Sequence, residues 1–184
     1  MIRIQPSAFF LLAALILLLP LDWLIAALLA AAIHELGHLA VLHAFGGHAE
    51  SISIEGAGAR INMGPLENRE EFLCAAAGPA ASFLLISLCR FFPKLAFCAL
   101  VQGMFNLLPV HPMDGGRMLR CFLCWRCPRQ VEGISNLVER LILFGFFALS
   151  LVLVICRRGG ILPALVCVTI LSRLLFTKIP CKSS

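Results

Sequence analysis

The sequence predicts an all-α polytopic membrane protein with about six transmembrane helices and a small β-hairpin at the membrane surface. Of the 184 residues, 60% are hydrophobic and only 14% are charged, which lies far outside the range of soluble domains. Several apolar runs approach the ~20 residues that a helix needs to cross a bilayer. No polar segment is large enough to form a core of its own, so residues 1–184 are expected to form a single membrane-embedded domain.

The apolar runs predict six spans. The first follows Arg3 and resembles the apolar region of a signal peptide, but no polar cleavage region separates it from the second run, so we interpret it as a retained span. The first and fourth spans are short, and we expect incomplete spanning or local thinning there. The six predicted spans cover residues 7–21, 23–45, 71–92, 95–110, 134–156 and 160–177.

One segment between the second and third spans alternates in polarity. Residues 51–54 and 59–63 alternate on either side of the glycine-containing stretch 55–58, a pattern typical of a β-hairpin. An exposed strand edge there can hold an extended peptide by main-chain pairing. The alternative, a hairpin that only caps the helices, has equal weight.

Charge bias predicts the orientation of the chain. Arg90, Lys94, Arg157 and Arg158 fall on one side, and most other basic residues fall on the opposite side. The positive-inside rule then places both termini in the cytoplasm. This bias and anionic lipid account for the net charge of +5, so the bilayer is expected as a partner and nucleic acid is not.

The second span contains His34, Glu35 and His38 within the sequence His-Glu-Leu-Gly-His. Residues four apart share a helix face, so both imidazoles can bind one metal ion, and the motif is typical of zinc metalloproteases in which the glutamate is the general base. A charge within a span costs about 2.5–3.5 kcal/mol, so these residues need partners or a function. The alternative is a polar seam between helices that binds no metal.

Catalytic zinc usually has three protein ligands, so the chain must supply a third. His43, His48, His111 and the acidic residues are candidates. Asp114 is the strongest, because it follows a span that ends on the same predicted side as the two histidines. His111, which lies between two prolines, is interpreted as a loop residue.

Three motifs together resemble the site-two protease family of intramembrane zinc metalloproteases. They are the His-Glu-Leu-Gly-His motif, the Gly-Pro pair at residues 78–79, and the stretch Asn-Leu-Leu-Pro-Val-His-Pro-Met-Asp-Gly-Gly at residues 106–116. The resemblance implies one Zn²⁺ per chain, held by His34, His38 and Asp114, with Glu35 as the catalytic base. Many relatives carry an asparagine where this chain has Ser82, which leaves the polar role of that position open.

Three further residues are candidates for substrate binding. Asn106 can hydrogen-bond a substrate backbone or pair with a neighbouring helix. Gly78 and Pro79 can interrupt a helix beside a water-filled cavity or simply kink it.

Within the family, small size and six spans resemble the branch of the stage IV sporulation protein FB. This resemblance implies a multi-pass protein of the bacterial cell membrane with its active site toward the cytoplasm. The implied substrate is a membrane-associated protein, such as a sigma-factor precursor cut by regulated intramembrane proteolysis during sporulation. Inhibitory membrane-protein partners are implied as well.

Two other interpretations remain. A non-catalytic membrane protein that binds or transports zinc would use the same residue types, although the two halves of the chain show no repeated hydropathy pattern. Cys121, Cys124 and Cys127 are spaced by threes, like part of a metal-ligand run, or they share one side of a short amphipathic helix.

Overall fold

The structure is a computed structural model, and it describes residues 2–4, 13, 16–47, 49–55, 58–63 and 67–156. The chain divides into two compact units, Met1–Val131 and Glu132–Ser184. All of the candidate ligands that the structure describes belong to the first unit. The single membrane-embedded domain stays a prediction.

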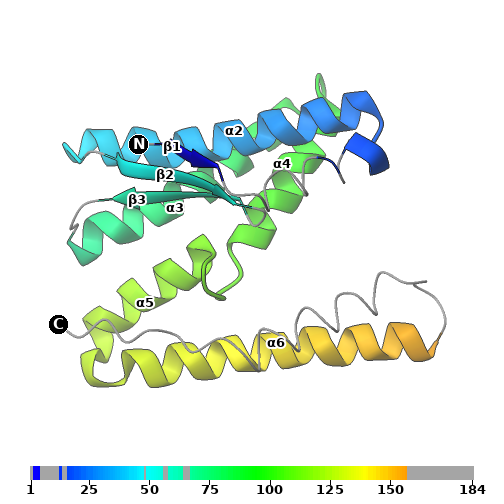
Figure 1. The fold of residues 1–184 in the computed structure, drawn as a ribbon. Helices are drawn as coiled ribbons and strands as arrows, with labels where there is room; N and C mark the ends of the chain where they lie inside the picture. The colour runs from blue at the N-terminus through cyan, green and yellow to red at the C-terminus, as the bar shows by residue number, and fades with distance from the viewer. Residues whose placement is uncertain are drawn as a thin grey trace. The chain divides into compact units, whose positions relative to one another are not determined.

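The first unit contains a small sheet and several helices joined by short connections in the sequence (Figure 1). The strands are β1 (Ile2–Ile4), β2 (Ala49–Glu55) and β3 (Gly58–Met63). The α-helices are α2 (Leu21–Ala44), α3 (Asn68–Leu84), α4 (Pro93–Asn106) and α5 (Asp114–Arg126). Short 3₁₀ helices η1 (Leu85–Leu88) and η2 (Pro128–Gln130) follow α3 and α5, and α6 (Val131–Ile155) is the main described element of the second unit.

Three helical segments of the described chain are long and apolar enough to cross a membrane: Leu21–Ala44, Asn68–Leu88 and Pro128–Val152. They correspond to the second, third and fifth predicted spans. Most of the first predicted span and all of the sixth lie outside the described residues, so the count of six stays a prediction.

The fourth predicted span, residues 95–110, was expected to be short, and its helix ends four residues earlier than predicted. The helix there is α4, which has 14 residues and ends at Asn106. Its length is about 21 Å, short of the ~30 Å of a hydrocarbon core. Residues 107–113 leave helical structure and α5 then begins at Asp114, because Pro109 and Pro112 cannot continue a helix.

The helix ends follow local chemistry. Pro93 occupies the first turn of α4, where a missing N–H costs nothing. The backbone N–H of Glu67 donates to the Glu70 carboxylate over 3.1 Å, which closes a capping box at the start of α3. After α2, Gly46 takes a φ of 70°, a conformation that glycine adopts without strain.

Small residues bring α2 and α3 into close contact. A Cβ atom on Gly37 would lie 2.7 Å from the carbonyl oxygen of Ala77 and 2.8 Å from the Cβ of Ala81. Such close helix contact is common between membrane helices, where small residues at the interface let two backbones approach. Helix α3 also contacts α4 and α5, and α2 contacts α4.

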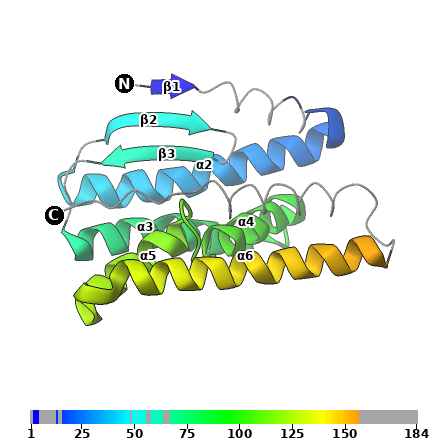
Figure 2. The ribbon, with the colours of Figure 1, turned by 60° about the horizontal axis from the view of Figure 1, so that its bottom comes forward.

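The segment expected to be a hairpin forms the antiparallel pair of β2 and β3 (Figure 2). A third strand, β1, pairs in parallel with β2 and brings Ile2 opposite Ile52. The sequence analysis did not predict β1, because three residues are too few to show a periodic pattern. The location of the sheet at the membrane surface stays a prediction.

Candidate metal centre

The centre of the first unit holds three buried side chains with metal-binding atoms. His34 and His38 lie one turn apart on α2, and Asp114 is the first residue of α5. They are 1%, 5% and 8% exposed. Among the described residues, this is the group of His, Cys, Asp or Glu side chains whose ligand atoms gather closely enough to hold a metal ion.

The ligand atoms form a nearly equilateral triangle. Asp114 Oδ2 lies 3.1 Å from His34 Nε2 and 3.2 Å from His38 Nε2, and the two Nε2 atoms are 3.3 Å apart. Tetrahedral zinc with bonds of about 2.0–2.1 Å keeps its ligands about 3.3 Å apart. The triangle therefore fits one face of a tetrahedral zinc site, and two imidazoles with a carboxylate are a common catalytic donor set.

A main-chain carbonyl orients His38. Its Nδ1 donates to the carbonyl oxygen of Cys74 on α3 over 2.7 Å, and the Cys74 thiol donates to the carbonyl of His38 over 3.5 Å. A carbonyl only accepts hydrogen bonds, so the Nδ1 atom must carry a proton. The Nε2 lone pair of the neutral ring is then free for a metal ion.

Two polar side chains contact His34. Its Nδ1 lies 2.8 Å from Ser82 Oγ, and its Nε2 lies 3.2 Å from Asn106 Nδ2. The sequence analysis left the role of Ser82 open, and the structure places this residue directly against a candidate ligand. Asn106 comes from the last turn of α4, so its amide reaches the same side of the ligand triangle as His34.

Gly78 allows α3 to approach the two histidines. A Cβ atom at Gly78 would lie 2.8 Å from His34 Nε2 and closer still to the ring of His38. The structure therefore gives Gly78 a steric reason to be glycine, which the sequence analysis did not foresee. Pro79 is buried next to it within a continuous helix, and the substrate-binding roles of both residues stay predictions.

The turn before α5 positions Asp114. A Cβ atom on Gly115 would overlap the carbonyl of Leu107, and one on Gly116 would lie 2.8 Å from the carbonyl oxygen of Val110. The two glycines thus let α5 start tightly against the preceding irregular segment. This explains why Asp114 returns toward α2 so soon after α4 ends.

Electrostatics keep the Asp114 carboxyl ionised. Asp114 begins a helix outside the three candidate spans. Burial by itself raises the pKa of this carboxyl, but its contacts with the imidazoles of His34 and His38 outweigh burial and hold the pKa at about 2. Arg117 Nη1 also lies 3.9 Å from the second oxygen, Oδ1. A carboxylate ligand is therefore available at neutral pH.

Glu35, the predicted base, is half-buried beside the triangle. It lies within electrostatic range of both histidines, Asp114 and Arg117. A general base must lie within hydrogen-bond reach of the proton that it takes, directly or through one water molecule. The role of Glu35 stays a prediction.

The other candidate ligands do not join the triangle. His43 and His111 are exposed, and His48 lies outside the described residues. Cys121 and Cys124 lie on α5, and Cys127 directly follows it. Burial raises the pKa of the Cys121 thiol to about 12, which disfavours the thiolate that binds metals.

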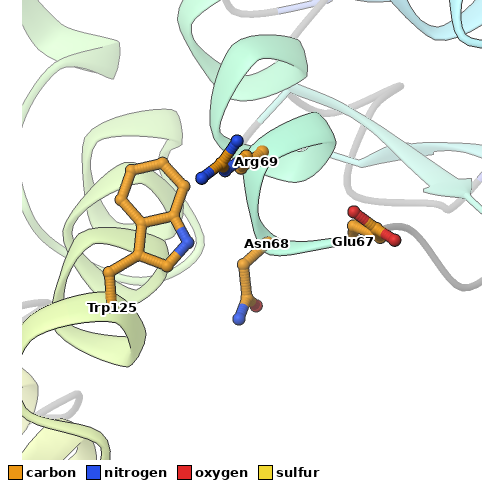
Figure 3. Close-up of a pocket in the computed structure, with 4 residues that line it drawn as sticks. All are labelled: Glu67, Asn68, Arg69 and Trp125. Carbon is orange, nitrogen blue, oxygen red and sulfur yellow. The ribbon is translucent and has the colours of Figure 1, made fainter.

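An open pocket lies elsewhere in the first unit, at the start of α3 and near the end of α5. Figure 3 shows the Arg69 side chain directed toward the indole of Trp125, with Glu67 and Asn68 nearby. None of these residues belongs to the ligand triangle. The sequence motifs did not predict this pocket.

The donor set of His34, His38 and Asp114 fits a catalytic zinc site, and a comparison with protein families points to a peptidase. The model of peptidase family M50 matches residues 86–151, a segment that includes Asn106 and Asp114.

Two further comparisons are with individual proteins. The zinc metalloprotease MJ0392 of Methanocaldococcus jannaschii is 29% identical over 143 residues, which cover 67% of this chain and 42% of that protein. A solved structure described as a site-2 protease from Methanocaldococcus jannaschii has a TM-score of 0.64 at 22% identity, over 100% of this chain and 94% of that one. The structural similarity, at this low sequence identity, shows a shared fold. The chain spans less than half the length of that zinc metalloprotease. Each comparison is a likeness: a partial match to the M50 family model, a sequence similarity to a zinc metalloprotease, and a fold shared with a site-2 protease.

Proposed function

We propose that this protein is an intramembrane zinc metalloprotease that cuts a membrane-associated protein substrate near the cytoplasmic face. One observation carries the proposal: His34, His38 and Asp114 present three ligand atoms 3.1–3.3 Å apart, with both histidines inside a candidate span. Buried polar groups at such a position are costly unless they have a function. The likeness to zinc metalloproteases supports the same conclusion.

The chain's own residues then have distinct roles. His34, His38 and Asp114 would hold the ion, which when bound supplies a Lewis acid that activates water and polarises a carbonyl group. Glu35 takes the proton from the attacking water and afterwards delivers it to the leaving amine. Asn106, whose amide lies next to His34, is placed to donate a hydrogen bond to the substrate backbone.

The substrate must present an unfolded peptide bond. A transmembrane helix protects its peptide bonds through internal hydrogen bonds, so local unwinding has to precede cleavage. Among the described residues, the outer strands β1 and β3 each pair along one edge only, and we propose that the other edge holds the unwound segment by main-chain pairing.

The biological setting is also a proposal. The positive-inside bias favours an active site on the cytoplasmic side. The resemblance to the sporulation branch suggests a bacterial cell membrane. The motifs resemble those of the sporulation branch of the family, which favours a sigma-factor precursor or a similar membrane-tethered regulator as substrate, with inhibitory membrane proteins as partners.

The test combines metal analysis with cleavage. The purified wild type is expected to contain one zinc per chain and to process a co-expressed membrane-tethered transcription factor. Glu35→Gln should retain the zinc and lose cleavage, because the amide cannot accept the proton. Full cleavage by metal-loaded Glu35→Gln would overturn the assignment, and zinc binding without any cleavage by the wild type would favour a zinc-binding or transport protein.

A further inference from the structure

The two candidate histidine ligands are anchored differently on the side away from the ligand triangle. The Nδ1 atom of His38 donates to a main-chain carbonyl, that of Cys74. The Nδ1 atom of His34 instead lies 2.8 Å from a side-chain hydroxyl, that of Ser82. The first anchor persists whatever side chain occupies position 74, whereas the second depends entirely on the residue at position 82.

This difference matters because of imidazole chemistry. A neutral imidazole that binds a metal ion through Nε2 carries its proton on Nδ1. A hydrogen-bond acceptor at Nδ1 therefore stabilises the metal-binding tautomer and fixes the plane of the ring. A serine hydroxyl can serve as that acceptor, and it has two lone pairs for the purpose.

Burial and close packing hold the Ser82 hydroxyl against His34. Ser82 is fully buried, so water does not compete for the Oγ atom. It lies one turn after Gly78 on α3, the residue that admits both imidazoles. On the other side, a Cβ atom at Gly103 of α4 would lie only 3.1 Å from the Cβ of Ser82. Two helices thus hold the Ser82 side chain in place against His34.

We infer that Ser82 is a positioning residue that orients His34 and selects its metal-binding tautomer, so that this hydroxyl controls metal affinity. The inference rests on the metal site of the proposed function. A Cβ atom at Gly103 would need the Ser82 side chain to shift by a few tenths of an ångström.

The test measures metal affinity directly. Ser82→Ala removes the acceptor and adds no bulk, and outer-shell changes of this kind typically cost about 10–100-fold in metal affinity. We expect that loss for zinc, measured by competition with a chromophoric chelator on the purified full-length protein in detergent. Ser87→Ala is the matched control, because Ser87 is an exposed serine a few residues later whose hydroxyl donates to Leu84. It should bind zinc like the wild type.

A second measurement separates positioning from simple destabilisation. Cobalt substituted for zinc reports ligand geometry in its visible spectrum, and Ser82→Ala should change that spectrum at saturating cobalt while Ser87→Ala should not. If Ser82→Ala fails to fold, Ser82→Cys preserves the shape with a much weaker acceptor, and its affinity should fall similarly.

The outcomes are distinct. Equal zinc affinities and equal cobalt spectra for the wild type and the Ser82 variant would overturn the inference and leave the proposed function intact. A wild type that binds no zinc at all would overturn the proposed function together with it. Weakened zinc binding confined to the Ser82 variants would support the inference.

Discussion

Helices α2 and α4 run in parallel and make polar contacts at both ends of their interface, yet the two ends differ in burial. At one end, Asn106 of α4 contacts the buried His34 of α2. At the other end, Lys94 of α4 forms an ion pair with Asp22 of α2, and both side chains are about half exposed. Between the ends, Ala30 and Ala99 pack in an apolar core with Leu85.

The exposed end is held by several weak contacts. The Lys94 ammonium lies 5.7 Å from the centre of the Trp23 ring, and Trp23 meets Phe97 edge to face at 5.8 Å. Exposed ion pairs contribute about 0–1 kcal/mol, and an aromatic pair contributes about 0.5–1.5 kcal/mol beyond its buried area. These contacts help to align the two helices, but substitutions there are expected to change the stability of the protein only slightly.

Substitutions at the buried end are expected to cost more, because a polar group that loses its partner there cannot form a hydrogen bond to water instead. Losing one partner leaves the others uncompensated, which costs several times more than the contact itself contributes. The comparison therefore predicts large effects of substitutions at the ligand triangle and small effects at the exposed ion pair.

The largest effect is expected for Asp114→Ala. This change removes a charged ligand from the triangle and leaves two buried imidazoles without their carboxylate partner. Zinc content of the purified protein should fall to the background level. Asp22→Ala, at the exposed end of the helix pair, is the matched control and should retain full zinc content; wild-type zinc content in Asp114→Ala would contradict the proposed ligand set.

Gly78→Ala should also greatly reduce zinc binding. The added methyl group would overlap the ring of His38 and approach His34 Nε2, so α3 would have to move away from α2. We expect a loss of zinc affinity of at least tenfold, comparable with the removal of an outer-shell group.

Gly145→Ala is the control for Gly78→Ala. No described residue lies within 4 Å of a Cβ atom at Gly145 on α6, and alanine favours a helix by about 1 kcal/mol over glycine. This variant should keep its zinc and its thermal stability. If both glycine variants bound zinc equally well, the close approach of α3 to the histidines would be wrong.

A smaller effect is expected for Arg117→Gln. Arg117 lies 3.9 Å from Asp114 Oδ1 and 3.7 Å from the Glu71 carboxylate, distances too long for hydrogen bonds. A pair of this kind contributes about 1 kcal/mol or less, so zinc affinity should fall by about fivefold at most. Chelator competition measures this change, with Arg120→Gln on the same helix as the control. A loss as large as that of Asp114→Ala would give Arg117 a more direct role.

The smallest effect is expected for Lys94→Gln. It breaks the exposed ion pair, so unfolding should become easier by about 0.2–1 kcal/mol, and high salt should reduce this difference. Zinc affinity should not change. Thermal unfolding in detergent at two salt concentrations tests this, with the exposed Arg90→Gln as the control; loss of zinc binding in Lys94→Gln would show that the two ends are coupled.

Several features of the site were readable from the sequence because they depend on local geometry. A four-residue spacing places His34 and His38 on one helix face in any helix. Asp114 was selected because its segment follows a span that returns to the same predicted side. The structure brings these three residues together.

Other features were not readable because they arise between elements distant in the sequence. The bond from Ser82 to His34 joins residues 48 positions apart, and nothing in either local pattern specifies it. The steric requirement at Gly78 exists only because α3 packs against α2 at that point. The end of α4 at Asn106 was likewise not readable, because residues 107–110 are largely apolar and were assigned to the fourth span.

The sequence by itself determined the apolar character of the chain, its long helices and the candidate metal ligands, since composition and helical periodicity are local properties. Only the tertiary structure decided which groups orient those side chains and how closely the helices approach. That decision depends on packing, because hydrogen-bond partners and close contacts are selected by which backbones meet in space.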